Sequence, residues 1–132
     1  MMFPKTKRLE NPHLLSMARG RDCLMRVPGV CNNDTSTTVA AHSNRAEHGK
    51  AFARKADDHF SAWACYSCHS WLDQGAGARD RELGQGMFTK ALARQVLAWH
   101  EIEIDPTAPA KDRQAALWAL FQHSRHPEEV TA

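Results

Sequence analysis

Four cysteines, arranged as two pairs, are the feature that most constrains how this chain of 132 residues can fold. Cys65 and Cys68 form a CxxC pair, and Cys23 and Cys31 are separated by seven residues near the N-terminus. Structural zinc sites bind four thiolates in a closed tetrahedron, and a CxxC turn presents two sulfurs from one loop. We therefore expect the four cysteines to bind one structural Zn²⁺ ion that ties the N-terminal segment to the middle of the chain.

Three other uses of these thiols remain open. Disulfides are less expected, because the basic N-terminus has no apolar export segment and thiols inside a cell stay reduced. The segment 65–69, Cys-Tyr-Ser-Cys-His, also matches the c-type haem attachment pattern, but haem would leave Cys23 and Cys31 without a role. A redox protein that cycles Cys65 and Cys68 predicts reactive thiols without bound zinc. Zinc is preferred because it uses all four cysteines.

Length, charge and hydropathy narrow the class of protein. One domain is expected at this length, and no stretch approaches the roughly 20 apolar residues of a membrane span, so we expect a cytoplasmic protein. The net charge is +2. Residues 1–60 contain ten Lys/Arg and six Asp/Glu, which suits a face that meets phosphates. We divide the chain into a mobile basic tail (1–10), a zinc-stabilised domain (11–104) and a C-terminal helical extension (105–132).

Local patterns predict a helix and a hairpin in the first half of the chain. Asn11 followed by Pro12 is typical of a helix start, and Gly20 can end that helix. The segments 37–42 and 60–65 are predicted as two strands joined by a polar, basic loop. A short helix is expected from Cys68 to about Gln74, where Gly75 and Gly77 can stop it. Mixed elements of this kind predict an α+β fold.

The C-terminal third is predicted to be helical. Phe88, Leu92, Val96 and Trp99 recur at helical spacing and form one apolar stripe. Pro106 and Pro109 should break the chain before a last helix. That helix is expected to carry one apolar face, made of Ala116, Leu117, Leu120 and Phe121. These helices are interpreted as packing elements.

Two histidines and an aspartate near the hairpin are candidate catalytic residues. His69 and Asp73 lie four residues apart on a predicted helix, so they share a face and can bind one cation such as Mg²⁺ or Mn²⁺. His42, at the end of the first strand, can act as a general base. Hydrolysis of a phosphodiester needs a base to activate water and a cation to stabilise charge. Taken singly, each residue has an ordinary structural explanation, and His69 could instead be a zinc ligand.

The loop between the predicted strands is rich in basic side chains. We expect it to contact the phosphate backbone of DNA, which is recognised largely without regard to sequence. The residues expected to make these contacts are Arg45, His48, Lys50, Arg54 and Lys55.

The order of these features resembles the HNH (His-Me finger, ββα-metal) nucleases that carry a structural zinc knuckle. The chain looks most like the small YbcO-type nucleases of phages and prophages, and the stretch from His42 to Asp73, with His48-Gly49-Lys50 inside it, is also similar to the nuclease domain of phage recombination-enhancement (Ref) proteins. The resemblance covers roughly residues 17 to 75. The segments that carry it are 23–31, 38–42, 55–58 and 64–69.

The resemblance implies a small zinc-stapled ββα-metal core with flanking helices, in which His42 is the general base and His69 and Asp73 are the ligands of a catalytic Mg²⁺ or Mn²⁺ ion. It implies a phage- or prophage-encoded, metal-dependent DNA endonuclease in the bacterial host, acting in recombination or replication with a possible recombination protein as partner. Many HNH enzymes carry Asp or His immediately before the catalytic histidine, and here Ala41 stands there.

That departure leaves an alternative open. A non-catalytic zinc-stabilised DNA-binding or adaptor domain would keep the cysteines and the basic loop but use His42 and His69 only for packing. If the protein is catalytic, His48, Asp57 or Asp58 could supply the missing metal ligand. Asn44 is the nearest counterpart of the asparagine that gives HNH enzymes their middle letter.

Overall fold

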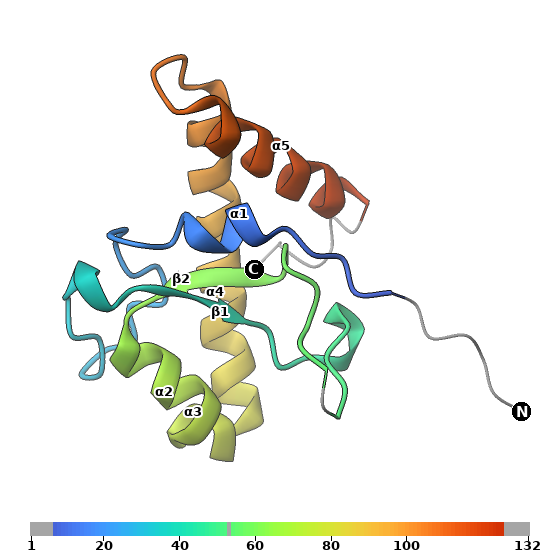
Figure 1. Cartoon of the computed structure of the whole chain (residues 1–132). Helices are drawn as coiled ribbons and strands as arrows, with labels where there is room; N and C mark the ends of the chain where they lie inside the picture. Colours follow the sequence, from blue (N-terminus) through green and yellow to red (C-terminus); the bar gives the residue numbers. More distant parts are fainter. Residues whose placement is uncertain (1–6, 53, 126–132) are drawn as a thin grey trace, which may run out of the picture.

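The structure is a computed structural model that describes residues 7–52 and 54–125. A two-stranded sheet lies between short helices, with one long helix running behind it (Figure 1). This mixture confirms the predicted α+β class. In chain order the elements are α1 (Pro12–Ser16), η1 (Thr35–Thr37), β1 (Val39–His42), η2 (Ala46–His48), β2 (Ser61–Ala64), α2 (Tyr66–Gln74), α3 (Ala76–Arg79), α4 (Arg81–Ile104) and α5 (Ala110–Ser124).

The predicted hairpin is present, with shorter strands than expected. β1 and β2 pair antiparallel, and His42 lies opposite Ser61. β1 starts at Val39 because the residues before it form the 3₁₀ turn η1, which the side chain of Asp34 caps by accepting a hydrogen bond from the N–H of Ser36. β2 ends at Ala64 because the next residue caps a helix. The hairpin therefore ends close to both the cysteine cluster and α2.

The helix after the hairpin begins two residues earlier than predicted. Cys65 is its N-cap, and the Cys65 sulfur accepts a hydrogen bond from the N–H of Cys68, so α2 starts at Tyr66 rather than at Cys68. The predicted end at Gln74 is confirmed, with Gly75 as the C-cap. Gly75 interrupts the helical structure by a single residue, because α3 begins at Ala76 and α4 follows it.

The first helix agrees with its predicted start. The side chain of Asn11 accepts a hydrogen bond from the N–H of Leu14, which satisfies one of the free amides at the start of α1. α1 ends at Ser16, and turns continue to Gly20, whose φ of 75° suits glycine. α1 lies against the sheet on the side opposite α2 and α3 (Figure 1).

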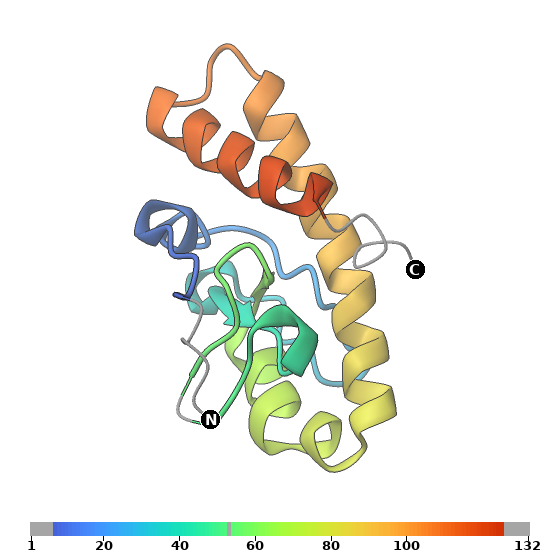
Figure 2. The ribbon, with the colours of Figure 1, turned by 90° about the vertical axis from the view of Figure 1, so that its right-hand side faces the viewer.

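The long helix α4 carries much of the core. Phe88, Leu92 and Trp99 are buried along it, as the apolar stripe predicts, and Val96 is half-buried. Two apolar clusters flank the sheet. The first contains Phe60, Leu72, Phe88 and Leu92, and the second contains Leu14, Trp63, Trp99 and Ala116. Figure 2 shows α4 running alongside the hairpin.

None of the helices within residues 7–52 and 54–125 is long and apolar enough to cross a bilayer.

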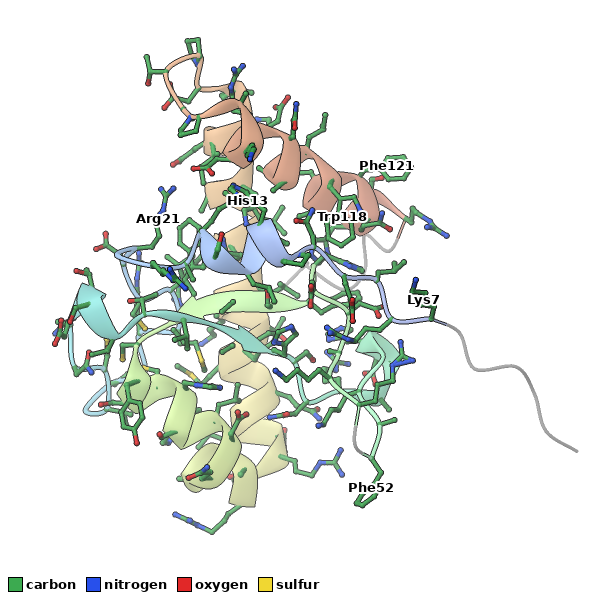
Figure 3. All side chains as sticks on the ribbon, in the orientation of Figure 1. Lys7, His13, Arg21, Phe52, Trp118 and Phe121 are labelled. Atoms are coloured by element: carbon green, nitrogen blue, oxygen red, sulfur yellow. The ribbon has the colours of Figure 1, made fainter. Side chains whose placement is uncertain are left out.

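The predicted apolar face of the last helix is wrong in two positions. Leu117 and Phe121 are 54% and 60% exposed, and Figure 3 shows Phe121 pointing away from the body of the protein. Small side chains allow α5 to approach its neighbours closely, so alanines rather than the larger residues face inward. The buried residues of α5 are Ala115, Ala116, Ala119, Gln122 and His123.

Parts of the predicted tail and of the predicted extension contact the rest of the protein. Leu9 is not in a mobile tail, because its N–H donates to Asp57 and its C=O accepts from the N–H of Asp58. Residues 1–6 of the predicted tail lie outside the described residues. α5 shares an apolar cluster with Leu14 and Trp99, so residues 110–124 pack into the same body as the rest.

α3 and α4 meet through two glycines. A methyl group at Gly84 would come within 2.2 Å of the backbone oxygen of Gly77, and one at Gly77 would come within 2.7 Å of the ring of Trp71. Real Cβ atoms do not approach a backbone oxygen this closely, so the two helices would have to separate. The contact requires glycine for its size rather than for its backbone angles.

We expect Gly84→Ala to lower the free energy of unfolding by about 1–3 kcal/mol through overpacking. Gly86→Ala is the matched control, because it lies in the same helix with open space around it, and there alanine should stabilise by about 0.5–1 kcal/mol. Urea unfolding of the two variants measures both values. Equal stability of the two variants would contradict the close contact between α3 and α4.

Candidate active site and cysteine cluster

The four cysteines lie together. All four are free thiols, and their sulfur atoms lie within 4.8 Å of one another, with Cys31 and Cys65 4.0 Å apart. Thiolates bound to zinc at about 2.3 Å in a tetrahedron stand roughly 3.8 Å from each other. The cluster therefore has the donor set and nearly the spacing that zinc requires, and it could hold such an ion.

Backbone geometry brings the two cysteine pairs together. A turn closes when the N–H of Cys31 donates to the C=O of Val27 at 3.0 Å, and Gly29 within it has a φ of 73°. The sulfur of Cys65 accepts hydrogen bonds from the N–H groups of Asn32 and Cys68. Burial alone would raise the pKa of Cys65, but these hydrogen bonds outweigh it and lower the pKa to about 7. Burial raises the pKa of Cys68.

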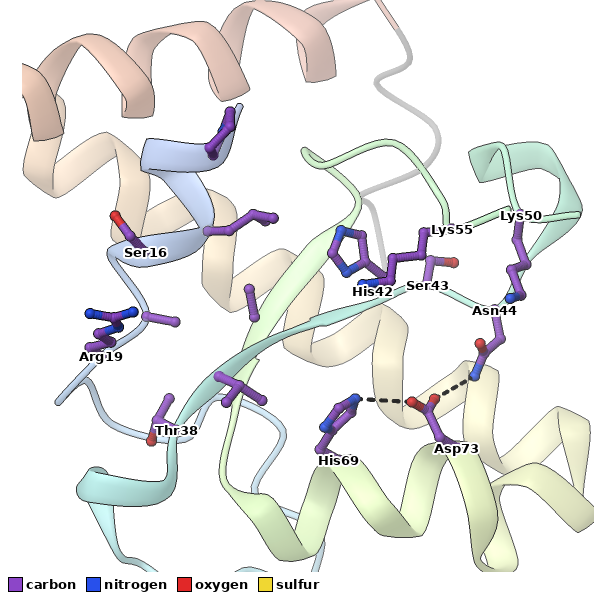
Figure 4. A pocket seen from close by; sticks show the side chains of 15 residues that line it. Ser16, Arg19, Thr38, His42, Ser43, Asn44, Lys50, Lys55, His69 and Asp73 are labelled. Carbon is purple, nitrogen blue, oxygen red and sulfur yellow. Dashed lines mark hydrogen bonds and ion pairs between the residues drawn. The ribbon is translucent and has the colours of Figure 1, made fainter. Parts of the chain in front are cut away.

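A pocket of about 610 Å³ opens beside β1, between α1 and α2. His42, Ser43 and Asn44 come from the end of β1, and His69 and Asp73 come from α2. Figure 4 shows these side chains around one hollow, with Lys50 and Lys55 at its edge. The fold therefore brings together His42, His69 and Asp73, the three residues predicted to be catalytic.

His42 is held by a buried carboxylate. Its Nε2 lies 2.9 Å from Oδ1 of Asp58, whose side chain is 2% exposed. Arg8 donates to the same carboxylate at 2.6 Å, and the N–H of Asn11 donates to its other oxygen at 2.7 Å. Burial would raise the pKa of Asp58, but hydrogen bonds from His42 and Asn11 and the charge of Arg8 lower it. Because the carboxylate accepts, the Nε2 of a neutral His42 carries the proton and Nδ1 is the nitrogen that can act as a base.

His69 and Asp73 form the second pair of the site. Nε2 of His69 lies 2.9 Å from one carboxylate oxygen of Asp73, and Asn44 donates to the other oxygen at 3.0 Å (Figure 4). The hydrogen bond to Asp73 raises the pKa of His69. Burial would raise the pKa of Asp73, but the hydrogen bonds from His69 and Asn44 lower it. A carboxylate and an imidazole on one face of a helix are groups that can bind a divalent cation together.

The residues predicted to contact phosphate include two lysines that line the pocket and two arginines that pair with acidic side chains. Lys50 and Lys55 line the pocket. Arg45 pairs with Glu47, and Arg54 lies 3.3 Å from Asp57.

His48 lies elsewhere than expected. It is buried, its ring stacks on Phe60 with centroids 3.9 Å apart, and it hydrogen-bonds to Ser43. This position corrects the prediction of His48 as a phosphate contact or as a ligand in the pocket. The connection between the strands folds back on the core here, which a pattern of polar residues does not reveal.

The position before His42 does not face the pocket. Ala41 is fully buried in the apolar cluster beneath the sheet, because neighbouring residues of a strand point to opposite faces. Asp57 and Asp58, the other suggested ligands, are occupied by hydrogen bonds to Leu9 and His42. Within residues 7–52 and 54–125, the cysteine cluster is the only group of three or more potential ligands. A cation at His69 and Asp73 would therefore have two protein ligands.

Two residues of the site were missed by reasoning from sequence. Sequence patterns place Asp58 only among possible metal ligands and Arg8 in the basic tail, yet Asp58 holds His42 and Arg8 holds Asp58. They lie sixteen and more positions away from His42 in the chain, so only the folded structure brings them together. The two adjacent aspartates at 57–58 are the sequence feature that could have indicated this network.

We expect Asp58→Asn to lower the free energy of unfolding at pH 7 by about 1–3 kcal/mol, because Arg8 and His42 lose a buried charged partner. The folded protein depresses the pKa of Asp58, so its stabilisation is present above the pKa of the unfolded chain and is lost as pH falls. Urea unfolding should show a gap between parent and variant that stays constant from pH 7 to about 5 and shrinks as the pH falls below about 4. Glu101→Gln, an exposed change on α4, serves as control. A gap that is independent of pH would contradict the role of the charge.

Zinc removal tests the cysteine cluster. The purified protein should contain about one zinc per chain, and Cys68→Ser should lose it together with several kcal/mol of stability. Ser67→Ala, in the same CxxC turn, should keep the metal. Elemental analysis and thermal unfolding measure both effects. A zinc-free protein with cycling thiols, or one with a Soret band, would instead support the redox or the haem interpretation.

Comparison with known proteins points to one family. A family model described as "Putative nuclease YbcO" matches residues 13–104, ending at the last residue of α4. The chain is 33% identical over 86 residues to "Putative nuclease YbcO" of Escherichia coli (strain K12) and to "Putative nuclease ybcO" of Enterobacteria phage 82, which covers 65% of this chain and 88% of each relative.

A solved structure is also similar. It is described as "Structure of a putative bacteriophage protein from Escherichia coli str. K-12 substr. MG1655", with a TM-score of 0.52 and 29% sequence identity over 67% of this chain and 98% of that one. The range matched by the family model, 13–104, contains the four cysteines and the pocket residues His42, His69 and Asp73. The chain belongs to the YbcO family.

Proposed function

We propose that this protein is a metal-dependent DNA endonuclease of the HNH type that hydrolyses phosphodiester bonds. The observation that carries the proposal is the pocket in which His42 and the His69–Asp73 pair meet two lysines. The names of the family and of its members support a nuclease, and two of those relatives come from a phage and from a bacterium. The order of hairpin, basic connection and helix supports the HNH class.

His42 is the proposed general base. Asp58 accepts the proton-bearing Nε2, which leaves Nδ1 to take a proton from an attacking water molecule. The imidazolium that forms is stabilised by the same carboxylate. Arg8 and the N–H of Asn11 keep that carboxylate ionised, so the base is oriented before substrate binds.

His69 and Asp73 are the proposed ligands of one Mg²⁺ or Mn²⁺ ion. When bound, such an ion supplies positive charge to the phosphate and to the leaving oxygen. Asn44 orients the Asp73 carboxylate through its hydrogen bond. Two protein ligands leave room for water and for phosphate oxygens, which Mg²⁺ commonly keeps in enzyme sites.

Lys50 and Lys55 are the proposed phosphate contacts at the mouth of the pocket. Ammonium groups bind phosphate as point charges and do not read bases, so we expect binding that depends weakly on sequence and strongly on salt. Arg45 and Arg54 stay part of the proposed DNA-binding surface, with the acidic partners named above. A phage- or prophage-encoded role in recombination or replication, inside a bacterial host and with a recombination protein as partner, completes the proposal.

The test is nicking of supercoiled plasmid with Mg²⁺, with Mn²⁺ and with EDTA. His42→Ala should lower the rate by a factor of about 10²–10⁴ while zinc content and folding stay unchanged. His100→Ala, an exposed histidine on α4, is the matched control and should cut at the parental rate. Cutting by His42→Ala at the parental rate would contradict the mechanism.

A second function is favoured by one observation: Ala41 is buried and offers no ligand atom, so among the described residues the pocket supplies two protein ligands for a cation, His69 and Asp73. It is a non-catalytic, zinc-stabilised DNA-binding or adaptor domain. DNA binding without nicking in any of several divalent metals would favour this function over the nuclease.

A further inference from the structure

A second hollow of about 520 Å³ adjoins the pocket. The two share three lining residues, Asn44, Lys50 and Asp73, so the proposed metal ligand Asp73 stands at their junction. The first hollow reaches Arg19 just after α1, and the second reaches Arg81 in the first turn of α4. Figure 1 and Figure 2 place α1 and the start of α4 on opposite sides of the hairpin.

The second hollow depends on the glycine contact between α3 and α4. Gly77 and Gly84 line it, and neither position has space for a methyl group. This wall of the hollow is therefore formed by closely packed helices, in which a larger side chain at Gly77 or Gly84 would not fit. Its wall also contains Leu72, which is buried in the core.

Arg81 and Arg19 are exposed, and neither has a carboxylate within ion-pair distance among the described residues. Arg81 also sits where a cation is unfavourable, because the start of a helix carries partial positive charge. Asp80 is already engaged as the N-cap of α4. Gln85 follows Arg81 by one turn and lines the same hollow.

We infer that the substrate strand runs through both hollows, so that the bond to be cut lies over Asp73 and the strand continues on either side of it. This inference rests on the proposed nuclease function and names the substrate as a polynucleotide held on both sides of the cut. Arg81 binds a backbone phosphate in the second hollow, and Arg19 binds one at the far end of the first. A guanidinium binds phosphate through two parallel hydrogen bonds, which fixes the strand in register.

Arg81→Gln tests the inference, with Arg79→Gln as matched control. Arg79 is an exposed arginine two residues away that lines neither hollow. Binding of fluorescein-labelled DNA is measured by anisotropy in the His42→Ala background at several salt concentrations. Arg81→Gln should weaken binding by about 3–10-fold and reduce the slope of log K against log salt by about 0.9. Arg79→Gln should leave the slope unchanged.

Cleavage supplies a second readout. In otherwise parental protein, Arg81→Gln should raise KM by about 3–10-fold and keep kcat at saturating DNA, because it removes binding and not chemistry. If parental protein binds and cuts DNA while Arg81→Gln and Arg79→Gln behave alike, the inference about the strand path is wrong and the nuclease proposal stands. If the parental protein neither binds nor cuts DNA, both are wrong.

Discussion

The cysteine cluster is the constraint on which the rest of the molecule depends. It joins the turn that ends at Cys31 to the point where β2 gives way to α2. Cys65 both belongs to the cluster and caps α2. The direction of α2, and with it the position of His69 and Asp73 beside β1, follows from how these four sulfurs are held. A chain of this size has a small core, and a metal ion held by the four cysteines would compensate for that.

The hydrogen bonds around Asp58 connect the stability of the fold to the geometry of the pocket. Asp58 is buried, and it gathers Arg8, Asn11 and His42 around one carboxylate. An uncompensated buried charge would be costly, so the hydrogen bonds from Arg8 and Asn11 stabilise the fold and also fix the carboxylate that orients His42. The same carboxylate therefore stabilises the fold and orients the proposed base. A substitution at Arg8 or Asn11 would for this reason also change the position of His42.

Sequence reasoning succeeded where local chemistry decides structure. The cysteine spacing predicted the cluster, the Asn11-Pro12 start predicted α1, and the i,i+4 relation of His69 and Asp73 predicted a pair that the structure shows in contact. It failed where packing over long distances decides. On α5 the larger side chains Leu117 and Phe121 face outward, because alanines allow the closer approach to neighbouring helices.

The same limit explains the errors within the site. The sequence around His48 is typical of a solvent-exposed basic loop, but the loop folds back and the His48 ring stacks on Phe60. Arg8 looked like part of a tail, and its place beside Asp58 depends on a contact between segments fifty residues apart. Neither position carries a local pattern that sets it apart from a surface residue.

The attachment of residues 8–11 to Asp58 has a practical consequence for anyone who produces this protein. A bulky affinity tag or fusion partner joined directly before Arg8 would pull on residues 8–11, whose hydrogen bonds hold the carboxylate that orients His42. Preparations that differ only in their N-terminal extension would then differ in activity while sharing one fold. A flexible spacer ahead of residue 7, or a tag that is removed by a protease, avoids that difference.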